Sequence, residues 1–288
     1  MRIEGRTLLA AAALIVGIFY GGETQAGVYF EEGFEGTLTP NWSTDSCSYM
    51  GISSPANGCN PSISSDMAHG GSKSLKGNYT GTCAVAGTPG ADCGVWAYRS
   101  YGPTDDLWLR FWYRTANFTY NFSNTKNVYL NTSSTGVPNG VWEHVYGSRE
   151  ISFTMQNVVE TCPSGSTVTC VYLPNVSSVP LSDNQWYCIE THNKMNTPGQ
   201  ANGVIEAFVN GVQTVGYYNR TFRGTSSNGA PSGNSSTAQF SGLKIFVQAG
   251  SGYMYYDDFA AGNTRIGCGT GTAQDVTAPA SPSGLRIQ

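Results

Sequence analysis

The sequence predicts an all-β protein, a sandwich or barrel of short antiparallel strands. Three observations support this class. No stretch after residue 26 shows the apolar spacing of a long amphipathic helix. Short runs of β-branched and aromatic residues recur instead, separated by Gly, Asn, Pro and Ser. In residues 107–114, Leu107 and every second residue after it point one way and the intervening residues point the other, as in a strand with one buried face.

Several segments carry this strand signal. They are residues 107–114, 127–131, 141–146, 186–193, 203–210, 243–249 and 253–260. The loop 196–202 contains Pro, Gly and Asn and joins two of these segments, so we expect a hairpin there.

The composition indicates a folded protein that does not bind nucleic acid. Of the 288 residues, 12% are charged and 12% are aromatic, which excludes intrinsic disorder. The formal net charge is −4, and Lys and Arg form no basic block. Because binding to nucleic acid depends on clustered Lys and Arg, we expect no nucleic-acid partner.

The first 26 residues have the features of a secretory signal peptide. Arg2 and Arg6 precede an apolar run at residues 8–20, and Ala26 offers a small residue for cleavage. The run is shorter than the ~20 residues that span a bilayer, although an uncleaved membrane anchor is the alternative. No later segment is long and apolar enough to span. We therefore expect residues 1–26 to be removed and the mature chain to lie outside the cell, at its surface or in a periplasm.

All eight cysteines follow this segment, and an even number fits an oxidising compartment. Many pairings are compatible with eight cysteines, but proximity along the chain suggests one set. Its pairs are Cys47–Cys59, Cys83–Cys93 and Cys162–Cys170, which leaves Cys188 to pair with Cys268. A zinc site is the alternative, but no two cysteines have the separation of about two to four residues that zinc ligands show.

The mature chain divides into a domain and a tail. Residues 27–268 are long enough for one large all-β domain. Residues 269–288 are rich in Gly, Thr, Ala, Ser and Pro, which is typical of a linker. Within this tail, residues 277–285 resemble the lead-in to a fibronectin type III module in secreted bacterial proteins.

Three segments, taken together and in order, resemble a known superfamily. They are FEEGFEG at residues 30–36, WYCIETHNKMN at 186–196 with GVIEAFVNG at 203–211, and YDDF at 256–259 with RIG at 265–267. This order resembles the concanavalin A-like lectin and glucanase jelly rolls of secreted polysaccharide-active proteins. That superfamily includes laminin-G-like modules and lyases of the heparin-lyase and glucuronan-lyase type.

The resemblance covers roughly residues 28–267 and implies a jelly-roll sandwich of two antiparallel sheets, stapled here by disulfides. It also implies that the opening strand lies beside the closing strand. The same jelly roll serves lectins, hydrolases and lyases, so the resemblance implies a polysaccharide ligand without fixing an activity.

One strand has an unusual combination of side chains for a solvent-exposed face. Its outward positions alternate two Trp with two Arg, at Trp108, Arg110, Trp112 and Arg114. Trp rings stack on sugars, and Arg holds a carboxylate or sulfate with two hydrogen bonds, so this face predicts an acidic glycan on the concave sheet. The alternative is structural: the Trp pack under loops and the Arg pair with Asp105 or Asp106.

A second polar face lies in residues 186–194. By alternation, Glu190, His192 and Lys194 project to one side, together with Trp186 and Cys188. We treat Glu190 and Lys194 as candidate substrate-binding residues and His192 as a candidate catalytic residue.

A polysaccharide lyase needs three groups that this chain contains. A base takes the proton beside a uronic-acid carboxylate, an acid protonates the leaving oxygen, and an amide or cation neutralises the carboxylate. The candidates are His144 or His192 as the base, Tyr146 as the acid, and Gln248 or Arg110 for the carboxylate. An ordinary structural role is the alternative for each histidine, including His69.

Two comparisons of motifs limit the enzyme hypotheses. Alginate-lyase-type members of the superfamily carry a Gln-Ile-His triplet that this chain lacks, and residues 247–253 only partly match their Lys-Ala-Gly-x-Tyr segment. Laminarinase-type hydrolases place their carboxylates as Glu-x-Asp-x-x-Glu on one strand, a spacing that is also missing. If the chain is an enzyme, the sequence therefore favours a lyase over a hydrolase.

Acidic residues occur at both ends of the expected domain, at Glu32, Glu35, Asp257 and Asp258. If the opening and closing strands pair, these carboxylates meet, and hard oxygen ligands of this kind suit a structural Ca²⁺. Exposed acids at a sheet edge are the alternative. The chain has no phosphate loop or dinucleotide fingerprint, so we expect no organic cofactor.

The sequence therefore predicts a secreted polysaccharide-interacting protein that binds an acidic glycan. The first alternative is a lyase that cleaves a uronic-acid polymer by β-elimination. The second alternative is a structural or adhesive protein of the cell surface.

Overall fold

The computed structural model describes twelve ranges of the chain. They are residues 27–45, 48–49, 52–53, 61–79, 96–119, 125–132, 141–145, 150–155, 172–173, 180–226, 235–248 and 251–269. The expected signal peptide and nearly all of the expected tail lie outside these ranges. So do Cys47, Cys59, Cys83, Cys93, Cys162 and Cys170.

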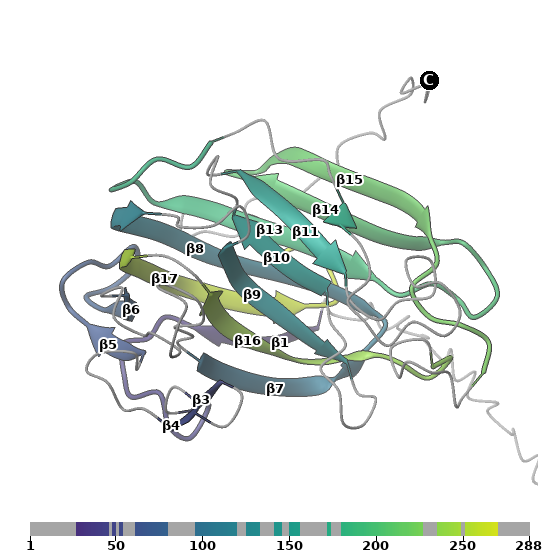
Figure 1. Ribbon diagram of the computed structural model, residues 1–288, viewed down its shortest axis with the longest axis horizontal. Helices are drawn as coiled ribbons and strands as arrows, with labels where there is room; N and C mark the ends of the chain where they lie inside the picture. Colours follow the sequence, from purple (N-terminus) through teal and green to yellow (C-terminus); the bar gives the residue numbers. More distant parts are fainter. Residues whose placement is uncertain are drawn as a thin grey trace, which may run out of the picture.

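The described residues form two antiparallel sheets that pack face to face, with no described helix (Figure 1). Sheet A contains, in spatial order, β15 (Val212–Arg220), β14 (Gly203–Val209), β13 (Tyr187–Lys194), β8 (Asp106–Thr119), β17 (Ser251–Gly262), β6 (Ser74–Tyr79) and β5 (Ser62–Ser64). The first strand, β1 (Val28–Glu32), also pairs with β17.

Sheet B is the second layer, and its strands overlie those of sheet A in Figure 1. It contains, in order, β12 (Tyr172–Leu173), β11 (Ile151–Met155), β10 (Val141–Val145), β9 (Thr125–Thr132), β16 (Phe240–Gln248), β7 (Trp96–Thr104) and β2 (Ser43–Asp45). A separate short pair joins β3 (Ser48–Tyr49) to β4 (Ile52–Ser53).

The structure confirms the strands that the sequence predicts. Each predicted segment coincides with a strand of one sheet or the other, with ends that differ by a few residues. The predicted hairpin is β13 and β14, in which Glu190 pairs with Phe208. The predicted pairing of the opening and closing strands is β1 with β17, in which Phe30 pairs with Ala261.

Strand β8 shows how alternation separates the core from the surface. Leu107, Leu109, Phe111 and Tyr113 are at most 2% exposed and lie between the sheets, whereas the four residues that alternate with them are half-buried on the outer face. Sheet B supplies its own inward residues, including Val128, Leu130, Phe153, Leu243 and Ile245. Each fully buried aliphatic or aromatic side chain contributes about 1.5–3 kcal/mol, so this shared interior holds the layers together.

The disulfide expected between Cys188 and Cys268 is present, with an S–S distance of 2.10 Å. It joins β13 to the segment that follows β17. The other three predicted pairings lie outside the described residues.

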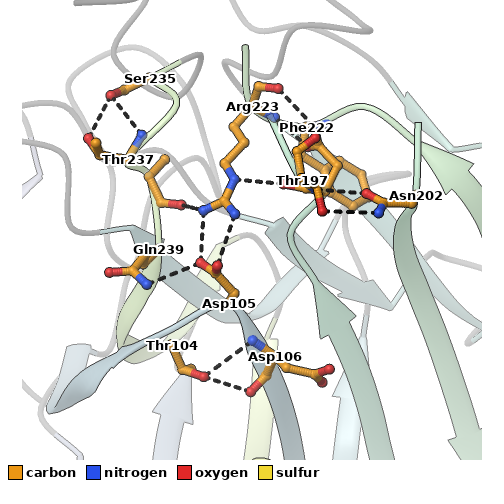
Figure 2. Close-up of polar contacts among 12 residues, drawn as sticks. Thr104, Asp105, Asp106, Thr197, Asn202, Phe222, Arg223, Ser235, Thr237 and Gln239 are labelled. Carbon is orange, nitrogen blue, oxygen red and sulfur yellow. Dashed lines mark hydrogen bonds and ion pairs between the residues drawn. The ribbon is translucent and has the colours of Figure 1, made fainter. Parts of the chain in front are cut away.

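An ion pair between the buried Arg223 and the half-exposed Asp105 ties four connecting segments together at one end of the sandwich (Figure 2). The Arg223 guanidinium donates to both carboxylate oxygens of Asp105, at 2.8 and 2.9 Å. It also donates to the backbone oxygens of Asn196 and Ala238, at 2.7 and 2.9 Å. Burial raises the pKa of Asp105, but the hydrogen bonds from Arg223 and Gln239 outweigh it, so the pKa lies below its usual value.

We expect Arg223→Met to lower the free energy of unfolding by about 2–3 kcal/mol, because two buried carbonyls lose their donor. Chemical denaturation measures this change. Lys194→Met is the control, since the Lys194–Asp106 pair is exposed and worth less than about 1 kcal/mol. Equal effects of the two substitutions would contradict the role given to Arg223.

Candidate functional site

The candidate residues lie on the two opposite layers of the sandwich. Strands β8 and β13 of sheet A carry one group, namely Trp108, Arg110, Trp112, Arg114, Glu190, His192 and Lys194. Sheet B carries His144 on β10 and Gln248 on β16, and Tyr146 lies outside the described residues. The predicted lyase residues therefore do not form one site, because the core separates Arg110 and His192 from His144 and Gln248.

The register of sheet B brings two predicted lyase residues to neighbouring positions. Gln248 on β16 pairs with Lys126 on β9, and Lys126 pairs with His144 on β10. His144 in turn pairs with Ser152 on β11. The bulge that skips Asn127 creates this alignment. We call Gln248, Lys126 and His144 the sheet B row.

A second row of paired residues runs across β7, β16 and β9. Tyr98 on β7 pairs with Lys244, and Lys244 pairs with Tyr129. Their chain neighbours Val128 and Ile245 belong to the core, so this row lies on the outer face of sheet B. Tyr129 is 1% exposed, and burial raises the pKa of its phenol. The outer face of sheet B thus carries Lys and Tyr positions next to His144 and Gln248.

On sheet A, His192 is held by two carboxylates. Its Nδ1 lies 2.8 Å from Glu206 Oε2, and its Nε2 lies 2.8 Å from Asp106 Oδ1. Its ring stacks on Trp108 with centroids 4.2 Å apart. Burial lowers the pKa of His192, but the two carboxylates outweigh it and raise the pKa above its usual value. With both nitrogens engaged, His192 has no free nitrogen to act as a base.

Glu190 is fully buried beneath residues 263–268, which we call the C-terminal strap. Its carboxylate accepts hydrogen bonds from Arg265 Nε at 2.8 Å and from the backbone amides of Ile266 and Gly267 at 2.9 and 2.6 Å. Arg265 also stacks over Phe208, and the disulfide of Cys268 closes the strap. Glu190 therefore anchors the chain and leaves no surface for a ligand.

The four predicted calcium ligands do not lie together. Glu32 accepts from Arg99 and from the Trp42 indole, at 3.0 and 3.2 Å. The other three surround the loop of residues 69–73. Glu35 accepts from the Ser72 and Lys73 amides, Asp257 accepts from the His69 and Gly70 amides, and Asp258 contacts the His69 ring. Burial raises the pKa of Asp257 to about 6.

The described part of the chain contains no group of three or more His, Cys, Asp or Glu placed to hold a metal ion. The four predicted acids therefore form no such group, although the calcium site that the sequence predicts needs only one carboxylate from each end of the domain together with backbone carbonyls. Glu35, Asp257 and Asp258 are the acidic groups that share one loop.

Lys126, Lys244 and Tyr129 are not among the candidate site residues that the sequence predicts. Lys126 and Tyr129 lie within or beside a predicted strand, and alternation with Val128 and Leu130 marks Tyr129 as outward. Their position beside His144 and Gln248 follows from strand order, which no single strand reveals.

Comparisons with known proteins identify the fold through structure alone. No protein-family model and no curated protein sequence matches the chain. An endo-β-1,4-glucuronan lyase from the fungus Trichoderma reesei matches with a TM-score of 0.58 and 12% identity, over 83% of this chain and 96% of its own.

Two further solved structures agree. The PL-14 alginate lyase from Aplysia kurodai matches with a TM-score of 0.57 and 13% identity, over 82% of this chain and 99% of its own. The cellulose-induced protein Cip1 matches with a TM-score of 0.53 and 18% identity, over 83% of this chain and 100% of its own. The fold is a concanavalin A-like jelly roll. Among the described residues of this jelly roll, no helix could cross a membrane.

We expect the paired His192 to make stability depend on pH. Its folded pKa is raised, so its contribution is complete below the unfolded pKa of about 6.5 and is lost as the pH rises through the folded pKa. Denaturant unfolding from about pH 5 to pH 9 measures this slope. We expect His192→Gln to be about 2 kcal/mol less stable near pH 6 and to lose the part of the slope above about pH 6.5, while Asp257 still contributes below it. Parallel curves for the two proteins would contradict this role.

Proposed function

We propose that the chain interacts with a polysaccharide and binds an acidic polymer on the outer face of sheet B. The observation that carries this proposal is the sheet B row, in which Lys126 lies between Gln248 and His144. A cation and an amide beside an imidazole suit a carboxylated sugar, because both favour its negative charge. Two proteins with this fold are named for lyase action on glucuronan and alginate, which supports the same ligand class.

The second candidate function is cleavage of that polymer by β-elimination, and the same row favours it. In this reaction His144 takes the proton from the carbon beside the carboxylate, while Lys126 and Gln248 stabilise the charge that develops there. The bond to the leaving oxygen then breaks, Tyr146 protonates that oxygen, and a double bond remains in the sugar. A protein that only binds would use the row without proton transfer.

We also propose that the mature chain works outside the cell. The features of residues 1–26 and the disulfide between Cys188 and Cys268 both fit an oxidising, extracellular compartment. A structural or adhesive role at the cell surface remains the alternative if no polysaccharide binds.

Ultraviolet absorbance tests cleavage, because β-elimination creates a conjugated double bond. We expect absorbance to rise with a uronic-acid polymer, and His144→Ala or Gln248→Ala to reduce the rate at least about 100-fold. Gln213→Ala, a matched change on the exposed edge strand β15, should leave the rate unchanged.

The outcomes separate the two candidates. A flat signal, together with slowed migration of the protein in a gel that contains the polymer, would favour binding without cleavage. A flat signal with normal migration for every polymer tested would contradict the proposed function.

A further inference from the structure

Two arginines on the outer face of sheet A form no ion pair with an acid among the described residues. Arg110 Nε donates to the backbone oxygen of Asp258 at 3.1 Å, and Arg114 Nη2 lies 3.4 Å from Asn184 Oδ1. By contrast, the described ion pairs of Arg99, Arg223 and Arg265 each use a carboxylate at 2.8–3.0 Å. Arg110 and Arg114 therefore leave positive charge available on this face.

The guanidinium of Arg114 also contains a donor without an acceptor. Its Nε is buried and has no hydrogen-bond partner. A buried donor of this kind costs stability, and a ligand can meet only the other nitrogens of the guanidinium. A negatively charged ligand beside Arg114 would engage this guanidinium.

Aromatic rings lie between and beside these two charges. Trp112, the outward residue between them on β8, stacks on the His69 ring with centroids 3.5 Å apart. Trp186 meets the same His69 ring edge-on at 5.9 Å, and Asp258 fixes that ring through Nδ1 at 2.7 Å. We call Arg110, Trp112 and Arg114, with the adjoining rings of His69 and Trp186, the cationic patch.

The rest of the outer face is occupied by the protein itself. Trp108 is stacked by His192, Glu190 lies under the C-terminal strap, and Lys194 pairs with Asp106. The ligand surface that the sequence assigned to six residues is thus reduced to the end of the face formed by the cationic patch.

We propose that the cationic patch is a second binding site for an anionic polysaccharide, on the layer opposite the sheet B row. The ligand class rests on the proposed function, whereas the site does not share its residues. Planar guanidinium groups bind carboxylates or sulfates in bidentate geometry, and Trp rings stack on sugars, so the patch fits a charged sugar chain. The patch holds the polymer while the sheet B row remains free for another segment.

Titration calorimetry with short uronic-acid oligosaccharides tests the proposal. We expect wild-type protein to bind two oligosaccharides per chain and Arg110→Gln/Arg114→Gln to bind one, with the lost site weakened by about tenfold to a hundredfold. Arg114→Lys keeps the charge but loses the planar fork, so it should also weaken this site. Arg220→Gln, a single charge removed from β15, is the control and should bind as wild type does.

The test separates failure of this site from failure of the proposed function. If the sheet B row binds nothing, wild type should bind one oligosaccharide and Arg110→Gln/Arg114→Gln none. If the folded double variant binds as many oligosaccharides as wild type with equal affinity, the cationic patch is overturned. Sulfated oligosaccharides form a parallel arm, and tighter binding there at the same site would identify sulfate as the preferred anion.

Discussion

The two-layer construction is the constraint on which the rest of the structure depends. Leu107, Leu109 and Phe111 of β8 fill the space between the sheets, so the residues that alternate with them must lie outside. The same rule applies on sheet B, where Val128 and Leu130 point inward. A ligand can therefore meet strand residues on only two surfaces, and the core keeps those surfaces apart. Function must be argued for each surface separately.

On the outer face of sheet A, most charged side chains pair with other groups of the protein. On sheet A, His192 is fixed between carboxylates and Glu190 holds the C-terminal strap, so these charges are satisfied within the fold. Buried pairs of this kind are costly to break because each partner would be left desolvated. Arg110 and Arg114 are the exceptions on this face. On sheet B, the register places His144 and Gln248 at positions on either side of Lys126.

Much of the fold could be predicted from the sequence because alternation and turn residues are local signals. They identified the strands and the inward face of β8, and the disulfide between Cys188 and Cys268 followed once nearer cysteines were paired. The site was harder to predict. The pattern of a strand shows which residues point to each of its sides, but it does not show which strands lie next to it. The sequence could not show that His144 and Gln248 lie on the opposite layer from Arg110 and His192, nor that a bulge at Asn127 aligns Lys126 with His144. Glu190 looked like a ligand residue because the strap that buries it lies 75 residues away.

The polysaccharide that we propose as the ligand would bind across β10, β9 and β16 on the outer face of sheet B. The most direct measurement is a crystal structure of the protein with a short uronic-acid oligosaccharide. We expect a sugar carboxylate beside Lys126, with His144 and Gln248 on either side of it. An oligosaccharide seen on sheet A alone, with sheet B empty in a crystal whose contacts leave that face open, would contradict the claim.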